Sequence, residues 1–224
     1  MAEDESAKVE AARPEHKPDG HVEAEVKLFG KYPYTGLVIN DGSLRQYVSL
    51  NPLQIPHSFA RHANKQFAKS KVNIVERLAN KLMRGGTGEK LGGKVIRTHG
   101  KLQGKKSKAI KIIEAAFEVV ERKTKQNPIQ MLIRALENSA PREDVTRVRF
   151  GGIAYQVATD VSAQRRLDLA LRNITLAAIL VAFNKKTTLA EALADEIILA
   201  ANGDLASFSV KRRNETERMA RSAR

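Results

Sequence analysis

The chain has 224 residues, 42% of them hydrophobic, which is enough for one large domain or two small ones with a sizeable core. Lys and Arg number 39 against 25 Asp and Glu, and this formal net charge of +14 indicates a polyanionic partner, either nucleic acid or an anionic membrane face. The lack of cysteine excludes disulfides, thiolate metal sites and cysteine nucleophiles, and no apolar run is long enough for a transmembrane helix.

The charge is unevenly distributed along the chain. Residues 1–27 hold eight acidic and four basic residues, which leaves the remainder with 35 basic and 17 acidic residues. This segment has no apolar core of the kind found in secretory signals, and it cannot bury enough apolar surface to become ordered. We therefore predict a disordered acidic tail over 1–27 and a single domain over 28–224.

Two amphipathic helices are predicted in the first half of the domain. Apolar residues recur at helical spacing over 74–83, before Gly85 and Gly86, and again over 107–124. The first stripe consists of Ile74, Val75, Leu78, Ala79, Leu82 and Met83. The second consists of Ile110, Ile113, Phe117 and Val120.

A third helix is predicted to begin at Asn127 and Pro128. Asn is a preferred N-cap and Pro fits the first helical position, where its missing N–H costs nothing. Pro141 ends the helix. Its apolar face comprises Ile129, Leu132, Ile133 and Leu136.

The period then changes from helical to alternating, and this predicts a β-hairpin over 145–161. Gly151 and Gly152 separate the two alternating runs and permit the positive φ angles of a tight turn. One face of the first strand carries Arg147 and Arg149, and one side of the second carries Ile153, Tyr155, Val157 and Val161. An isolated hairpin is only marginally stable in water, so this hairpin should pack against helices or against a partner.

Two further helices follow the hairpin. Ser162 is predicted to cap a helix through about residue 182, with Leu167, Leu171, Ile174 and Val181 facing inward and Arg165, Arg166 and Arg172 facing outward. A Thr188–Glu191 capping box opens the next, which buries Leu189, Leu193, Ile197 and Ala200 and ends at Asn202 and Gly203. Residues 211–224 are predicted to form a basic, charged C-terminal tail with helical potential.

Motifs for catalysis are incomplete. The glycine-rich stretch 88–94 matches the phosphate-loop spacing as far as Lys94, but Val95 replaces the hydroxyl residue that would hold magnesium. The five histidines form no HExxH motif, and no G-x-S-x-G motif occurs. The sequence therefore indicates no catalytic, metal or cofactor site and no small-molecule substrate.

Basic clusters are the main chemical signal. Residues 90–111 contain eight bases and no acid, residues 61–84 contain seven bases and one acid, and further arginines flank the hairpin. Only 5% of the residues are aromatic and Trp is absent, so a broad stacking platform for single strands is not expected. Dispersed Lys and Arg suit phosphate contacts with a folded RNA.

A series of short blocks, in order along the chain, closely resembles the universal small-subunit ribosomal protein seven family (bacterial S-seven, eukaryotic S-five). The blocks are 28–31 (LFGK), 39–41 (IND), 56–58 (PHS), 74–78 (IVERL), 104–107 (GKKS), 135–138 (ALEN), 141–144 (PRED), 151–152 (GG), 155–157 (YQV), 165–166 (RR), 193–196 (LADE), 211–213 (KRR) and 218–220 (RMA). The segment before Ile74 and the block 141–144 resemble the archaeal and eukaryotic branch. The loop 90–104 is longer than the bacterial pattern.

The resemblance implies a mainly α fold, a single helical domain of about six to seven helices with one protruding β-hairpin. It implies a non-enzymatic, cytoplasmic constituent of the small ribosomal subunit that binds the three-prime major domain of its rRNA and initiates assembly of the head. Expected rRNA contacts are Lys105, Lys106, Lys108, Arg142, Arg147, Arg149, Arg165, Arg166, Arg172, Lys211, Arg212 and Arg213.

The resemblance also implies a place in translation for the hairpin tip. Arg149, Gly151, Gly152 and Tyr155 would lie near exit-site tRNA and mRNA, and the C-terminal tail would approach a platform protein. The other expected partners are neighbouring head proteins, with no membrane. The alternatives are a DNA-binding architectural or helix-turn-helix protein, which would need a short helix pair with a base-reading helix, and a P-loop enzyme, which would bind ATP.

Overall fold

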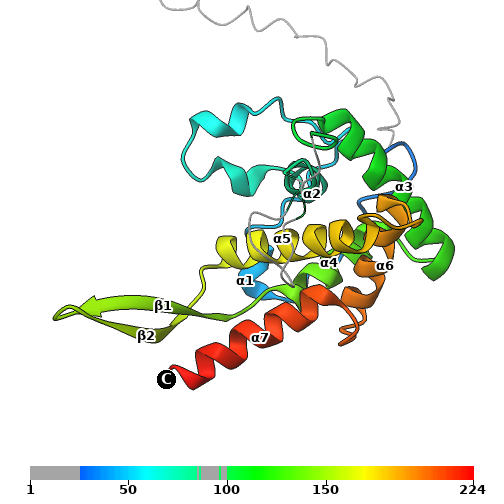
Figure 1. Cartoon of the computed structure of the whole chain (residues 1–224). Helices are drawn as coiled ribbons and strands as arrows, with labels where there is room; N and C mark the ends of the chain where they lie inside the picture. Colours follow the sequence, from blue (N-terminus) through cyan, green and yellow to red (C-terminus); the bar gives the residue numbers. More distant parts are fainter. Residues whose placement is uncertain (1–25, 85, 87–95, 97–99) are drawn as a thin grey trace, which may run out of the picture.

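The computed structural model describes residues 26–84, 86, 96 and 100–224. Within them, seven α-helices and one two-stranded sheet form a mainly helical body with a projecting hairpin, which confirms the predicted fold class (Figure 1). The predicted acidic tail over 1–27 lies almost entirely outside the described residues, as does most of the loop 85–104. The elements are α1 (Gly42–Arg45), η1 (Arg61–Asn64), η2 (Ala68–Lys71), α2 (Ile74–Leu82), α3 (Lys106–Thr124), α4 (Pro128–Ser139), β1 (Glu143–Phe150), β2 (Ile153–Asp160), α5 (Ala163–Ala182), α6 (Leu189–Ala201) and α7 (Phe208–Ser222).

The core lies where α6 packs against α3, α4 and α5. Most of the apolar residues assigned to the helical stripes are buried there, because each stripe places residues three and four apart on one helix face. Val181 is an exception, since 42% of it is exposed in the last turn of α5. Met83, Ile110 and Leu189 are half-buried and pack against the edge of the core.

Side-chain caps fix the starts of α4 and α6. Asn127 accepts a hydrogen bond from the Ile129 amide at 3.0 Å, with Pro128 in the first turn. Thr188 and Glu191 form both bonds of the predicted capping box. Ser162 occupies the N-cap of α5, but its hydroxyl makes no capping hydrogen bond.

The N-terminal part of the body, residues 26–57, packs on the helices although no element was predicted there. Leu28 and Leu44 are fully buried, and the Tyr32 ring meets the Phe117 ring edge-on with centroids 6.1 Å apart. Asp41 caps the short helix α1 by accepting from the Ser43 amide. This segment thus completes the core against α3 and α5.

The hairpin and α7 lie together on one side of the body (Figure 1). The strands pair from Glu143–Asp160 to Phe150–Ile153, so the hairpin begins two residues before the predicted start at 145. Residues 211–224, predicted as a tail, belong to α7 as far as Ser222. Because Val210 and Ala220 are buried, this helix is part of the body.

Candidate nucleic-acid interface

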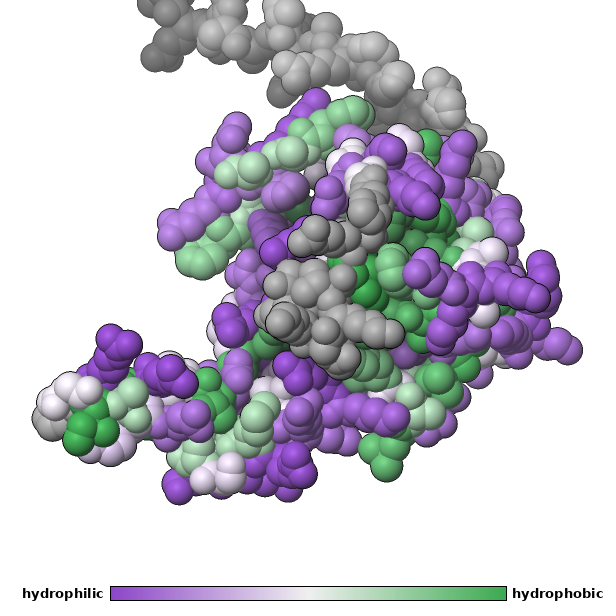
Figure 2. Space-filling view, in the orientation of Figure 1, coloured by the Kyte–Doolittle hydropathy of each residue, from purple (hydrophilic) through white to green (hydrophobic). Residues whose placement is uncertain are grey.

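Two projections leave the body on the same side. One is the β-hairpin, and the other is the segment 58–71, here called the arm, which contains η1 and η2 (Figure 1). The first half of α5 lies between them, and the space-filling outline is indented there (Figure 2). Some of the residues predicted to bind RNA lie on the hairpin and on α5. These residues are therefore on the side of the body from which the hairpin and the arm project.

The hairpin has two chemically different faces. The register pairs Arg147 with Gln156 and Arg149 with Ala154, which places both arginines on one face. Both are exposed, as is the turn at Gly151 and Gly152. The hairpin can therefore present two guanidinium groups to phosphates without any rearrangement of the body.

The opposite face of the hairpin is apolar. Val148 faces Tyr155 across the ladder, and Val157 lies next along the same face. Between 42% and 50% of each of these side chains is exposed. Tyr155, which is predicted to lie near tRNA and mRNA, therefore exposes its ring on the face of the hairpin opposite the two arginines.

The start of α3 gathers lysines where a helix usually prefers acids. Lys105 occupies the N-cap without a capping side-chain bond, and the first turn contains no acidic residue. Lys105 and Lys108 are exposed. Because the positive end of the helix dipole repels these ammonium groups, an anion such as phosphate bound here relieves an unfavourable charge arrangement.

Lys106 differs from its two predicted companions. Its ammonium group donates to Glu76 at 2.5 Å, and 17% of its side chain is exposed. Glu76 is fully buried and also accepts from the amide and hydroxyl of Ser58, at 2.9 and 2.7 Å. Burial by itself raises the pKa of the Glu76 carboxyl, but the bonds from Lys106 and Ser58 outweigh burial and hold the pKa below its usual value.

The three arginines predicted to face outward on α5 have different environments. Arg165 is exposed and lies 3.5 Å from Asp144, whereas Arg172 is half-buried. Arg166 is 7% exposed, so its predicted outward position is wrong. Its guanidinium bonds Asp41 at 2.8 Å, the Pro141 carbonyl at 3.2 Å and Ser43, and in this way it joins α5 to the N-terminal segment and to the base of the hairpin.

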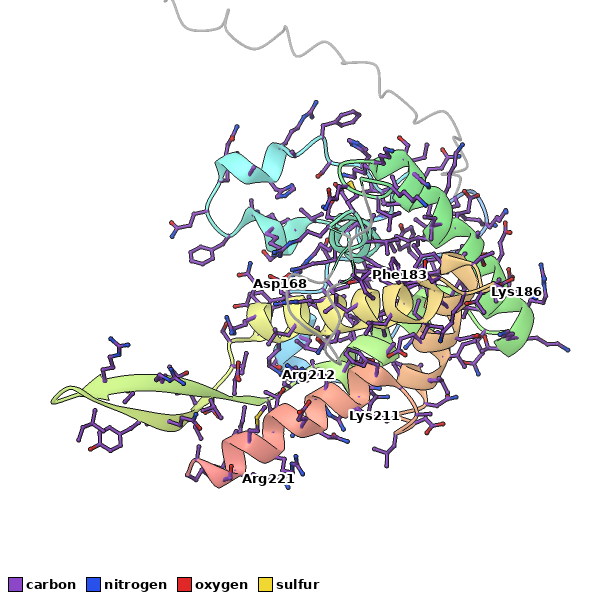
Figure 3. All side chains as sticks on the ribbon, in the orientation of Figure 1. Asp168, Phe183, Lys186, Lys211, Arg212 and Arg221 are labelled. Carbon is purple, nitrogen blue, oxygen red and sulfur yellow. The ribbon has the colours of Figure 1, made fainter. Side chains whose placement is uncertain are left out.

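A cation cluster that the sequence analysis did not assign surrounds Asp168 on α5, labelled in Figure 3. Its carboxylate contacts Lys69 at 2.5 Å, Arg77 at 3.2 Å and Lys81 at 3.7 Å. Burial lowers the pKa of the Lys81 ammonium, and Asp168 offsets only part of this effect because Lys69, Arg84 and Arg77 repel the charge. The excess of bases over 61–84 was the available signal, but nothing local indicated that they would meet on α5.

The cations predicted to bind RNA in the C-terminal segment lie on α7 in different environments. Figure 3 labels two of them, Lys211 and Arg212. Lys211 is exposed. Arg212 pairs with Glu215 at 2.7 Å, and Arg213 donates to the Asn138 carbonyl at 2.6 Å. Arg142 is also exposed, at the base of the hairpin.

A hollow beside the base of the hairpin and α7 has a different character from the cationic surfaces. It measures about 810 Å³ and mixes charges, with Asp41, Glu137, Glu143, Glu217, Arg142, Arg213 and Arg221 in its wall. Among the described residues, no group of three or more His, Cys, Asp or Glu could hold a metal ion. No described helix is long and apolar enough to cross a bilayer.

Comparison with known proteins identifies the family of the chain. The sequence profile of the family described as ribosomal protein S7p/S5e matches residues 44–224. The chain is 48% identical to the small ribosomal subunit protein uS7 of Methanosphaera stadtmanae over 88% of this chain and 98% of the relative. It is 46% identical to that of Methanothermobacter thermautotrophicus over the same shares, and 47% identical to that of Archaeoglobus fulgidus over 92% and 98%. The chain therefore belongs to the ribosomal protein S7p/S5e family, as an archaeal-type member, and is a structural protein and not an enzyme.

Proposed function

We propose that this protein binds the three-prime major domain of small-subunit rRNA, nucleates assembly of the head, and lines the path of exit-site tRNA and mRNA during translation in the cytoplasm. Its partners are then the rRNA and the neighbouring head and platform proteins. The observation that carries the proposal is the set of exposed cations on the hairpin, α5 and the start of α3, in a chain of formal net charge +14.

The proposed mechanism is placement by phosphate neutralisation. Exposed side chains that form no internal ion pair make these contacts at the least cost, because they have no partner to give up. Lys105, Lys108, Arg147 and Arg149 meet this condition best. Arg142, Arg165, Arg172 and Lys211–Arg213 are the other proposed contacts, while Lys106 and Arg166 act mainly by holding the body in shape.

The hairpin tip is proposed to serve the tRNA and mRNA path. Gly151 and Gly152 adopt φ angles of 58° and 83°, which make the narrow turn that other residues would strain. Tyr155 supplies an exposed ring beside this turn. A narrow, exposed end with a cationic and an apolar face can reach a nucleic acid that lies away from the body.

The salt dependence of RNA binding tests the proposal. Affinity for a fragment of the three-prime major domain should fall steeply as salt increases, with a log–log slope of about 0.9 for each neutralised duplex phosphate. The double variant Lys105→Glu and Lys108→Glu should lower this slope by about 2. Arg122→Glu with Lys125→Glu, at the other end of α3, makes the same charge change and should leave the slope unaltered.

Two outcomes would contradict this proposal. An affinity that barely depends on salt would exclude phosphate neutralisation as the mechanism. Equal binding to a DNA duplex of the same length would favour the alternative class of DNA-binding architectural protein.

A further inference from the structure

The arm carries two exposed phenylalanines. Phe59 is 74% exposed and Phe67 is 71% exposed, more than any other large hydrophobic side chain among the described residues. The Phe59 ring contacts the His57 ring at a tilt of 51°, with centroids 4.2 Å apart, and most of its surface stays in solvent. Only 5% of the residues are aromatic, yet two aromatic rings are exposed on this one segment. This arrangement indicates a ligand with a flat apolar face.

The backbone of the arm is unusual at these same positions. Phe59, Ala60 and Phe67 have φ angles of 50°, 57° and 58°, a left-handed region in which bulky residues are outliers. Phe59 and Ala60 precede η1, and Phe67 precedes η2. Strained positions of this kind persist where surrounding contacts enforce them, and they concentrate at functional sites.

The contacts that enforce the arm's position are found near its two ends. Ser58 is held by the buried carboxylate of Glu76, through bonds of 2.9 and 2.7 Å. Lys69 is held by Asp168 at 2.5 Å. The phenylalanines therefore lie on a segment tied to α2 at one end and to α5 at the other, which lowers the entropic cost of presenting them to a ligand.

The charge of the arm identifies the ligand class. Residues 58–71 include Arg61, Lys65, Lys69 and Lys71 and no acidic residue. A hollow of about 390 Å³ lies between the arm and the helices, and its described lining includes His62, Lys69, Lys81 and Arg84, with Asp168 as the only acid among those residues. Arg77 also lines this hollow, and its buried Nε has no hydrogen-bond partner.

We propose that the arm binds an unpaired stretch of RNA, with bases stacked on Phe59 and Phe67 and a phosphate in the hollow beside Lys81 and Arg84. This proposal rests on the proposed function, because it assigns a second kind of RNA contact to the same protein. Stacking accepts any base and needs flat faces, which the two phenylalanines of the arm supply, whereas the start of α3 offers lysines and no aromatic ring. A protein partner would have to bury the arm's cations against a surface that supplies both acids and an apolar patch, whereas RNA supplies anions and flat faces together.

Tryptophan substitution gives a direct readout, because the chain contains no tryptophan. In full-length protein, Phe67→Trp or Phe59→Trp introduces the sole indole, and stacking on a base quenches its fluorescence. Oligoadenylate should quench both, while an abasic oligonucleotide of the same length and charge should not. Leu205→Trp, at another exposed position, is the matched control and should respond to neither.

Leucine substitution then measures affinity. The double variant Phe59→Leu and Phe67→Leu keeps apolar bulk but removes the flat rings, and should weaken oligoadenylate binding by roughly 10- to 100-fold. Its affinity for an RNA duplex should stay within about twofold, since backbone contacts carry that binding. Its melting temperature should not change, because both side chains are exposed.

The outcomes separate this inference from the proposed function. If wild-type protein binds duplex RNA with a steep salt slope but the leucine variant binds oligoadenylate as tightly as wild type, the arm proposal alone is wrong. Quenching that is equal with the abasic strand would also overturn it. If the leucine variant instead fails to recruit a neighbouring protein in assembled subunits while oligoadenylate binding is intact, the arm is a protein-docking surface. If wild-type protein binds no RNA at all, both proposals fail.

Discussion

Arg165 and Arg166 are adjacent in the chain but have opposite environments. The Arg165 side chain is 65% exposed, and its contact with Asp144 is a surface ion pair of small energetic value. The Arg166 side chain is 9% exposed and is bonded on three sides, including to Asp41. The difference arises from helix geometry, because a step of one residue turns the side chain by about 100° around the axis.

Arg166→Ala should therefore destabilise the fold while Arg165→Ala should not. Removal of the buried guanidinium leaves Asp41 without its cation, and we expect a loss of about 3 kcal/mol in the free energy of unfolding. The matched Arg165 variant should change stability by less than about 1 kcal/mol. Urea unfolding of both proteins measures the difference, and equal stability would show that Arg166 has no structural role.

The pH dependence of stability has a local origin at Glu76. Its folded-state pKa is held below its usual value near 4.5, so its bonds to Lys106 and Ser58 add stability at neutral pH that is lost as pH falls through the folded pKa. The stability gap between wild type and Glu76→Gln should be widest near pH 7 and narrow below about pH 4.5. Denaturant titrations at pH 7, 5 and 3 measure this gap. A constant gap would mean that the charge on Glu76 contributes nothing.

At the scale of elements, the hairpin and the helices depend on different interactions. The hairpin strands pair mainly with each other, and α7 contacts the strands, more with β1 than with β2. Arg149, Gly151 and Gly152 at the hairpin tip are exposed, whereas the helices bury the apolar stripes that form the core. The hairpin end can therefore be removed with little cost to the body.

Replacing residues 149–155 by a short turn should spare folding and binding of the body to rRNA, but should weaken retention of exit-site tRNA in assembled subunits. Subunit assembly and tRNA retention can be measured side by side in the truncated protein. Arg147→Ala in the intact hairpin serves as the control for loss of one charge. If assembly collapses while completed subunits hold tRNA normally, the hairpin is a structural piece and its proposed role at the tRNA path is wrong.

The elements were largely predictable from the sequence, because their signals are local. The Thr188–Glu191 capping box spans four residues, and the change to period two marked the hairpin directly. The long-range connections were not predictable: Arg166 meets Asp41 across 125 positions, and Lys69 meets Asp168 across 99. No local pattern records which charges a fold will bring together, so the inward position of Arg166 and the Asp168 cluster were missed.

At the scale of the whole molecule, the net charge of +14 opposes the folded state until RNA is bound. Raising NaCl from about 0.05 to 0.3 M shortens the screening length below about 10 Å. Relief of about 1 kcal/mol of repulsion should then raise the melting temperature by about 2–4 °C. Calorimetry at the two salt concentrations checks this, with Lys105→Glu and Lys108→Glu as a less positive control that should respond less. A fall in melting temperature would show that ion pairs dominate over repulsion.

The two-stranded hairpin has a consequence for copies of the protein that have not joined a subunit. Each of its strands has one neighbour among the described strands, so each has an outer edge that no further strand covers, and the face around Tyr155 is apolar. Edges of this kind template strand addition from another chain, which leads to aggregation. Arg147 and Arg149 on β1 should oppose such association, because the same strand of a second copy, added along the edge of β1, would bring like charges together. The cationic face that is proposed to bind RNA is thus also expected to disfavour association between copies of the protein.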